Sequence, residues 1–448
     1  MDINVSMAAA SQATASSAPW HFGRLWKILS GDRACSWADQ AAVSLANFIA
    51  LILVARWGGA SEVGIYAVGY SVLVMALAVQ ESMITRPYSI QLYHPQGRAA
   101  EHAFSSLVMS AILSAVVTVG FAACSLVLMG FSAEVATIGW ALAVAAPLVL
   151  LREFARRFCF AHLKVVDALV LDILVAALNV AILCILAAMG RLSAATAFLS
   201  IGASCGVGGL AWLYLARSHF EPSFKYLWAV IRQSSSLGKW VMFSHLTAHA
   251  QGYSSHWLIL SVMGAAATGI YAACLSIVAF ANPLIYGFCN ILTPRFVRTL
   301  QNEGMTGLKL QAAWDTLVLV AAMALFCTVV AVGGDQAMRL LYAGSEYQGH
   351  GHLLNVLALA CLAAAAGVPA CTAMTSAQRA GLSAGVTAVS ALATVGVVWW
   401  CLTHWGLIGA AYGMLVSEAV GSLARWAAFA MMKRPGPGAR SATERAGG

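Results

Sequence analysis

Long apolar stretches follow one another from residue 36 to residue 430, and this pattern constrains the fold more than any other feature. Charged residues make up only 9% of the chain, and residues of the hydrophobic set make up 61%. A water-soluble domain has about 25% charged residues, so this chain cannot cover itself with a water-compatible surface. A helix that spans a bilayer needs about 20 mostly apolar residues. The sequence therefore predicts an all-α integral membrane protein.

Twelve stretches are long and apolar enough to be predicted transmembrane helices. They cover residues 36–56, 63–84, 104–130, 135–152, 166–189, 194–216, 241–263, 265–292, 309–333, 352–374, 381–403 and 406–430. With the N-terminus in the cytoplasm, every Lys and Arg falls on the cytoplasmic side except Arg56, Arg191 and Arg339. Because cytoplasmic segments are enriched in Lys and Arg, this sorting favours twelve spans with both termini cytoplasmic. It also accounts for the net charge of +8 without a nucleic-acid partner.

The chain contains a repeat. The tetrapeptide GIYA begins at Gly64 and again at Gly269, and at the same offset Gly59 falls on Gly264. The octapeptides TRPYSIQL and TPRFVRTL lie at equivalent positions, at the ends of the second and eighth predicted spans. Six spans separate the copies, so both halves enter the membrane in the same direction. This pattern predicts two parallel six-helix repeats around a central cavity.

Composition divides the chain into six predicted segments. They are a disordered N-terminal tail (1–19), an interfacial amphipathic helix (20–35), a first six-helix bundle (36–217), a cytoplasmic linker (218–240), a second six-helix bundle (241–431) and a disordered cytoplasmic tail (432–448). The interfacial helix mixes Trp and Leu with Arg24 and Lys27, as helices at the membrane surface do. The linker is basic and carries a run of serines, which favours a hinge on the cytoplasmic surface.

Polar side chains follow one face of the first helix in each half. In the first half they are Gln40, Ser44 and Asn47, and in the second half the equivalent region carries His245, His249 and His256. Asn282 precedes a proline that should kink the eighth span. Lipid does not accept such groups, so we interpret these seven residues as lining a substrate cavity. The alternative is interhelical hydrogen bonding within each bundle.

Charged residues near the span ends suggest two further roles. Arg86 and Arg295 occupy nearly equivalent places in the two halves, and the arginine fork suits a phosphate. Asp39 and Glu81 are acids near the inner ends of the first two spans, and are candidates for coupling to protons or cations. Both interpretations have a simpler alternative. In it, the arginines only set the orientation of the helices in the membrane, and Asp39 lies near enough to the membrane surface to reach water.

Four other groups of charged residues receive weaker interpretations. Asp172 and Asp315 are further acids within or beside predicted spans. Glu418 is another, and it can pair with Arg425 two helical turns away. The cluster of Arg152, Arg156 and Arg157 is interpreted mainly as a topology signal.

Signals of catalysis and metal binding do not emerge from the sequence. It contains no HExxH or Walker A motif, and the eleven cysteines show no CxxC spacing. The glycines at Gly202 and Gly206 form a GxxxG pattern, which favours close helix packing over a phosphate loop. We therefore predict no catalytic residue, no metal site and no enzyme activity.

Two long stretches resemble a known family. The segment LWKILSGDRACSWADQAAVSLANFIALILVARWGGASEVGIYA resembles the opening of bacterial polysaccharide flippases of the Wzx type, and the segment from GKWVMFSH to TPRFVRTL resembles the start of their second half. These proteins belong to the multidrug/oligosaccharidyl-lipid/polysaccharide (MOP) exporter superfamily.

The resemblance implies a multi-pass protein of the bacterial inner membrane. It implies two six-helix bundles facing a central cavity, and translocation of undecaprenyl-diphosphate-linked oligosaccharides for exopolysaccharide, capsule or O-antigen synthesis by alternating access. It further implies basic residues for the diphosphate, here Arg86 and Arg295, and coupling to protons or sodium, here through Asp39 or Glu81. A polysaccharide polymerase and export machinery are the protein partners it suggests, and no cofactor is expected.

Two other functions stay open from the sequence. One is a multidrug/cation antiporter of the same superfamily, which would need an acidic, aromatic cavity. The predicted stripe of amide, hydroxyl and imidazole groups suits sugar hydroxyls better. The other is a membrane-bound polysaccharide polymerase or acyltransferase, which would need a reaction centre.

Overall fold

A computed structural model describes residues 32–92, 99–130, 133–342 and 345–432. The predicted tail 1–19, nearly all of the predicted interfacial helix 20–35, and the C-terminal tail from residue 433 lie outside the described residues. All regular elements in the described part are helices. They are α2 (Asp32–Gln80), η1 (Glu81–Thr85), α3 (Arg86–Gln91), α4 (Ala99–Leu128), α5 (Ala133–Ala161), α6 (Val165–Ala188), α7 (Ala194–Leu215), η2 (Arg217–His219), α8 (Leu227–Met263), α9 (Ala265–Val278), η3 (Ala279–Ala281), α10 (Asn282–Leu341), η4 (Ser345–Tyr347), α11 (Gly351–Ala366), α12 (Val368–Ser376) and α13 (Ala380–Met431).

Eight helical segments of the described chain are long and apolar enough to cross a membrane, which makes this a multi-pass membrane protein. Three of the long helices bend at a glycine with positive φ: Gly59 (80°), Gly304 (67°) and Gly406 (62°). Glycine has no Cβ and adopts this conformation without a clash. The first two predicted spans lie on α2, on either side of Gly59. The count of twelve spans and the side of the termini stay predictions.

The seventh predicted span lies on α8, which is not among the eight apolar segments. Three histidines, a glutamine and several serines make this helix too polar to resemble a lipid-facing span. The eighth predicted span contains the 3₁₀ turn η3 just before Asn282 and Pro283, and the residues that flank this turn keep right-handed helical φ and ψ. The kink expected at this proline stays a prediction.

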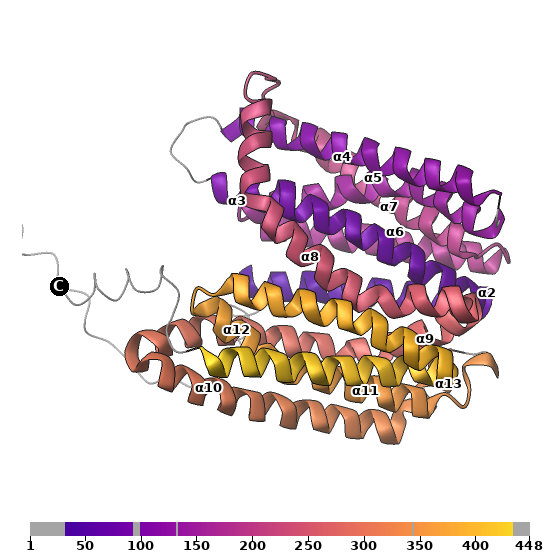
Figure 1. Cartoon of the computed structure of the whole chain (residues 1–448). Helices are drawn as coiled ribbons and strands as arrows, with labels where there is room; N and C mark the ends of the chain where they lie inside the picture. Colours follow the sequence, from indigo (N-terminus) through magenta and orange to yellow (C-terminus); the bar gives the residue numbers. More distant parts are fainter. Residues whose placement is uncertain (1–31, 93–98, 131–132, 343–344, 433–448) are drawn as a thin grey trace, which may run out of the picture.

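The helices pack into two lobes (Figure 1). The N-lobe contains α2 to α7, in which α5 packs on α4 and α7, and α6 packs on α2 and α7. A Cβ on Gly202 would lie 2.8 Å from the Cα of Ala145, and one on Gly206 would press on Leu148. The close packing predicted from these glycines is thus confirmed. The C-lobe contains α9 to α13, and α8 slants from the N-lobe to the C-lobe (Figure 1).

The two copies of the repeated tetrapeptide meet where α2 crosses α9. A Cβ on Gly64 would overlap the carbonyl oxygen of Ala265, and a Cβ on Gly269 would overlap the carbonyl oxygen of Ala60. The turns that precede them match as well, with φ and ψ of 80° and 179° at Gly59 and 86° and −177° at Gly264. The sequence repeat therefore lies at a close approach of the two lobes.

The predicted linker 218–240 differs from the structure in its second half. After η2 and a short irregular segment, α8 begins at Leu227, so residues 227–240 are helical. Val230, Ser234 and Gly238 lie at i, i+4 and i+8 and are buried against the protein. A Cβ on Gly238 would overlap the carbonyl oxygen of Ser82, which shows how closely α8 approaches η1. This packed face holds the segment in a helix.

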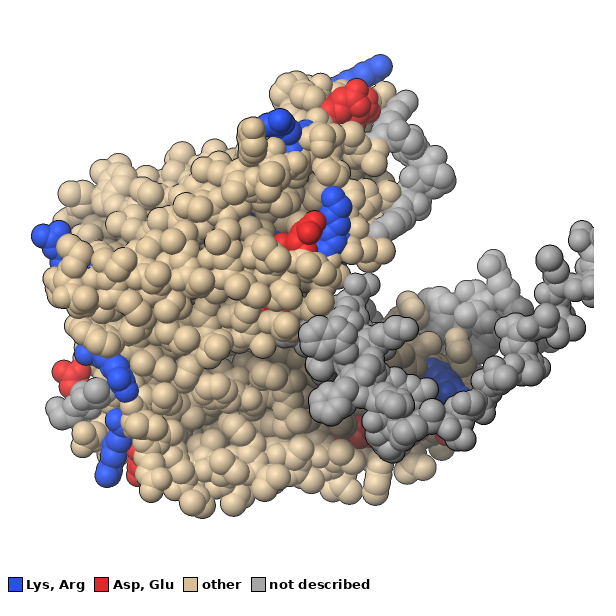
Figure 2. All heavy atoms as spheres, turned by 180° about the vertical axis from the view of Figure 1, so that it is seen from behind, with Lys and Arg blue, Asp and Glu red and all other residues tan. Residues whose placement is uncertain are grey.

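A cleft separates the lobes at one end of the molecule. Figure 2 shows it as a wedge at the end of the molecule where α13 ends in Figure 1. The opposite end is closed by contacts between the lobes. The guanidinium of Arg56 donates to the carbonyl oxygens of Leu340 and Leu341, the latter at 2.8 Å, and the amide of Ala60 donates to Glu346 Oε2 at 3.1 Å.

Candidate functional site

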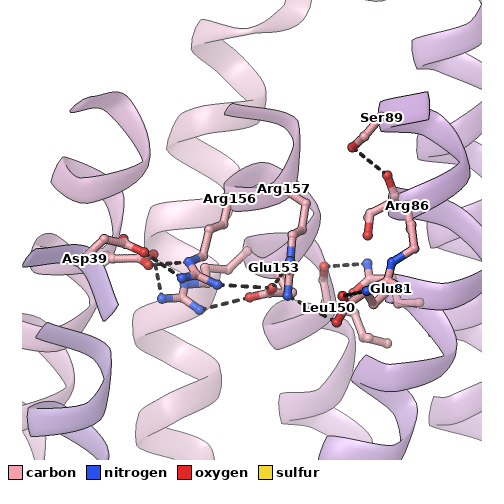
Figure 3. A network of polar contacts seen from close by, with 12 residues as sticks. Asp39, Glu81, Arg86, Ser89, Leu150, Glu153, Arg156 and Arg157 are labelled. Atoms are coloured by element: carbon pink, nitrogen blue, oxygen red, sulfur yellow. Dashed lines mark hydrogen bonds and ion pairs between the residues drawn. The ribbon is translucent and has the colours of Figure 1, made fainter. Parts of the chain in front are cut away.

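Eight charged side chains form a network in the N-lobe (Figure 3). They come from the start of α2, from η1 and α3, and from α5 and α6. The network consists of four acids, Asp39, Glu81, Glu153 and Asp172, and four arginines, Arg86, Arg152, Arg156 and Arg157. The formal charges of the eight side chains cancel.

Arg156 is the centre of the buried part of this network. Its Nη2 lies 2.6 Å from Asp39 Oδ2, and its Nε lies 2.7 Å from Asp172 Oδ2. Arg152 Nη2 contacts the other oxygen of Asp172 at 2.5 Å. The side chains of Asp39 and Asp172 are 1% and 0% exposed. Buried carboxylates are costly unless they are paired, so these arginines hold the start of α2, α5 and α6 together.

The network continues toward the cleft through Glu81. Arg157 Nη2 lies 3.2 Å from Glu81 Oε2, and Arg86 Nη2 lies 3.2 Å from Glu81 Oε1. Glu153 completes the link, because it accepts a hydrogen bond from Arg157 Nε at 2.8 Å. Glu81 also begins η1, a π-helical turn, and such turns occur frequently at functional sites. Arg86 is 46% exposed and is the most open member of the network.

Two interpretations from the sequence need correction here. Arg152, Arg156 and Arg157 are more than topology signals, because each is paired with acids from its own or other helices. Asp39 does not reach water, because Arg156 buries it within the lobe. The sequence contains a signal for this network. Three arginines lie at i, i+4 and i+5 near the end of one predicted span, and acids such as Asp172 lie on neighbouring spans.

The predicted polar stripe of α2 is open to solvent or lipid along its whole length. Gln40, Ser44 and Asn47 are all exposed, and Asn47 Nδ2 lies 3.4 Å from the hydroxyl of Tyr70. Tyr70 was not predicted, but it extends the stripe onto the second half of α2. The structure therefore places amide, hydroxyl and phenol groups together on the N-lobe.

The three predicted histidines of α8 have different surroundings. His245 Nδ1 lies 3.3 Å from Ser82 Oγ of η1, next to the N-lobe network. The ring of His249 stacks on Tyr253, with 6.4 Å between the centroids. His256 is only 5% exposed and packs edge to face on Tyr271 at 5.5 Å. His256 is therefore part of the packed interior in this conformation, and it does not line the open cleft.

The C-lobe holds its own charged pairs. Arg295 Nη1 lies 3.1 Å from Asp315 Oδ1, and Gln311 donates to the other oxygen of that acid at 2.9 Å. The pair predicted between Glu418 and Arg425 is confirmed at 3.9 Å. Arg86 and Arg295 thus share three features: equivalent positions in the two halves, one acidic partner each, and side chains exposed by 46% and 52%. Asn282 is exposed at the first position of α10.

Comparison with known proteins identifies a family and a fold. Residues 38–300 match a family described as polysaccharide biosynthesis protein. No curated protein matches the chain. A solved structure of a multidrug resistance MATE family transporter of the MOP superfamily, in an inward-facing conformation, superimposes with a TM-score of 0.73 at 15% identity, covering 92% of this chain and 100% of that one.

Two further solved structures share the fold. A MOP superfamily transporter from Pyrococcus furiosus, described as having a binding pocket of reversed polarity, gives a TM-score of 0.65 at 14% identity over 93% of this chain and 95% of its own. An outward-facing MATE family transporter gives 0.59 at 14% identity over 94% and 98%. These likenesses establish the helical fold of MOP exporters and leave the substrate open.

Proposed function

Because this chain belongs to the polysaccharide biosynthesis protein family and has the fold of MOP exporters, we propose that it is a lipid-linked oligosaccharide flippase. In this proposal it moves undecaprenyl-diphosphate-linked repeat units across the bacterial inner membrane, from the cytoplasmic to the periplasmic leaflet. The polymer served is an exopolysaccharide, a capsule or an O-antigen. The protein acts as a transporter, with no catalytic residues and no cofactor.

What supports this proposal is a cleft between the lobes that is open at one end and closed at the other, together with exposed polar side chains on α2 and partly exposed histidines on α8. Lipid does not accept the amide, hydroxyl and imidazole groups of Gln40, Asn47 and His249, so a polar substrate is their natural counterpart. The greater likeness to the inward-facing relative agrees with this geometry. Rocking one lobe on the other, about the crossing of Gly64 and Gly269, would exchange the open end.

The charges at the cleft favour an anionic headgroup. Arg86 and Arg295 are half exposed, so each can leave its single carboxylate partner and form paired hydrogen bonds with a diphosphate. A cationic drug would need unpaired acids, whereas Glu81 and Asp315 are both held by arginine. This contrast favours the flippase over the multidrug antiporter.

Coupling to protons or sodium through Asp39 and Glu81 is a further part of the proposal. Both acids belong to one arginine network that joins the start of α2 to η1. Binding of a proton or cation to either acid would weaken its ion pair with arginine. The contacts that join the start of α2 to η1 would then change. An uncoupled flippase driven by consumption of its product is the alternative.

The test is the leaflet distribution of lipid-linked oligosaccharide in cells that lack the protein. We expect accumulation on the cytoplasmic side, loss of surface polymer, and rescue by the wild-type chain. Rescue should fail with Asn47→Ala combined with His249→Ala, and succeed with the control His404→Ala on α13. Unpolymerised repeat units on the periplasmic side would instead indicate a polymerase. Unchanged lipid and polymer, with altered drug sensitivity, would favour the antiporter.

A further inference from the structure

The first turns of α8 lie across the end of the N-lobe at which the cleft opens. In Figure 1 they run past the ends of the other N-lobe helices, close to α3, before the helix turns into the molecule. The preceding segment is fixed on the start of α4. The amide of Glu221 donates to the carbonyl of Ala100 at 3.3 Å, and the Phe224 ring meets Phe104 edge to face at 5.4 Å. This position suits the membrane surface.

The segment has two faces of different character. One face is buried by the packing of Val230, Ser234 and Gly238 on the protein. The other is exposed and forms a surface hollow of about 590 Å³. The hollow is lined by Lys225, Trp228, Ala229, Arg232, Gln233 and Ser236.

The exposed face carries positive charge without acids of its own. Between Glu221 and Glu303 the sequence contains no Asp or Glu. Lys225 and Arg232 form no ion pair with any residue that the structure describes, in contrast to the arginines of the N-lobe network. Trp228 lies between them and is 75% exposed. An exposed tryptophan beside cations is typical of the headgroup layer of a bilayer.

We propose that this hollow binds the phosphate headgroup of an anionic glycerophospholipid from the leaflet on the open side of the cleft. Lys225, in the turn just before α8, lies seven residues before Arg232, and in this proposal both contact the same headgroup, while Trp228 anchors the segment at the level of the glycerol. The same helix continues to His245 and His249 at the cleft, so lipid binding would fix the position of a cleft wall. The inference depends on membrane insertion and not on the identity of the transported substrate.

The experiment uses the full chain in a neutral detergent, with phosphatidylglycerol as the probe and phosphatidylcholine as the neutral control. Native mass spectrometry counts bound lipid. We expect selective binding of phosphatidylglycerol, weakened about 30-fold by Lys225→Gln with Arg232→Gln, since each surface cation contributes on the order of 1 kcal/mol toward anionic lipid. The variant Lys225→Arg with Arg232→Lys keeps the charge and should bind as the wild type does.

A charge-matched control separates a local site from a general charge effect. Arg191→Gln with Arg339→Gln also removes two exposed cations, at the closed end of the molecule, and should leave binding unchanged. An equal loss in both double variants, or no loss in the first, would overturn the proposal. Selective binding of undecaprenyl diphosphate with no binding of phosphatidylglycerol would overturn it as well, and would assign the hollow to the substrate.

Discussion

At the scale of single residues, Arg156 decides whether the interior of the N-lobe is stable. It is the partner of Asp39, whose other carboxylate oxygen has no hydrogen-bond partner, and it shares Asp172 with Arg152. We expect Arg156→Met to destabilise the protein by about 3 kcal/mol, because it leaves a buried carboxylate unpaired. Thermal unfolding in detergent measures this, with exposed Arg191→Met as the control.

A second substitution separates the charge effect from lost packing. Adding Asp39→Asn to Arg156→Met removes the unpaired carboxylate and should recover part of the stability. If the double variant is no more stable than the single one, the arginine acts through its packing and the network is not an electrostatic unit.

The paired arginines at the cleft give a prediction about binding. Arg86→Ala with Arg295→Ala should weaken binding of a polyprenyl diphosphate by about 10- to 100-fold, because each removes charge-assisted hydrogen bonds. The matched control is Arg298→Ala, one turn beyond Arg295 on α10 and also exposed. Binding can be measured with the purified, folded variants. Unchanged affinity in the double variant would leave both arginines as topology signals.

At the scale of elements, the sequence predicts much of the helical architecture. It does not predict which charged side chains pair with one another. The repeat predicted two equivalent halves, and the structure adds that its glycines, Gly64 and Gly269, lie where the lobes cross, because close helix contact there leaves room only for glycine. Asp39, Arg156 and Asp172 lie on three different helices, and no local pattern states which acid meets which arginine. The serines before Gly238 suggested a linker. In the structure Val230 and Ser234 are both buried, and their spacing of four residues is that of one face of a helix.

The crossing of α2 and α9 also carries a prediction. Gly64→Ala places a methyl group onto the carbonyl of Ala265, and Gly269→Ala does the same at Ala60. We expect each to cost about 1–3 kcal/mol in stability through overpacking. Gly120→Ala is the control, since a Cβ there meets nothing within 4 Å. Equal thermal stability of Gly64→Ala and Gly120→Ala would show that the lobes separate freely at this point.

At the scale of the whole molecule, the balance between the two open states depends on contacts at the closed end. Arg56 donates to the carbonyl oxygens of Leu340 and Leu341, and Glu346 accepts from the amide of Ala60, so both contacts join the lobes. Both exist only while this end is shut. Removing them therefore destabilises the present conformation relative to the oppositely open one, without touching the cleft walls.

We expect Arg56→Ala with Glu346→Ala to shift the population toward the state open at the other end by about 30-fold, since each of the two charged contacts contributes on the order of 1 kcal/mol at a partly exposed site. Hydrogen–deuterium exchange should rise at the amide of Ala60 and its neighbours and fall in η1, as the cleft closes. Glu62→Ala is the control, because Glu62 caps α7 within the N-lobe, accepting from Ala194 at 2.6 Å. Faster exchange at Ala60 with unchanged exchange in η1 would mean local fraying, and the two ends would then not be coupled.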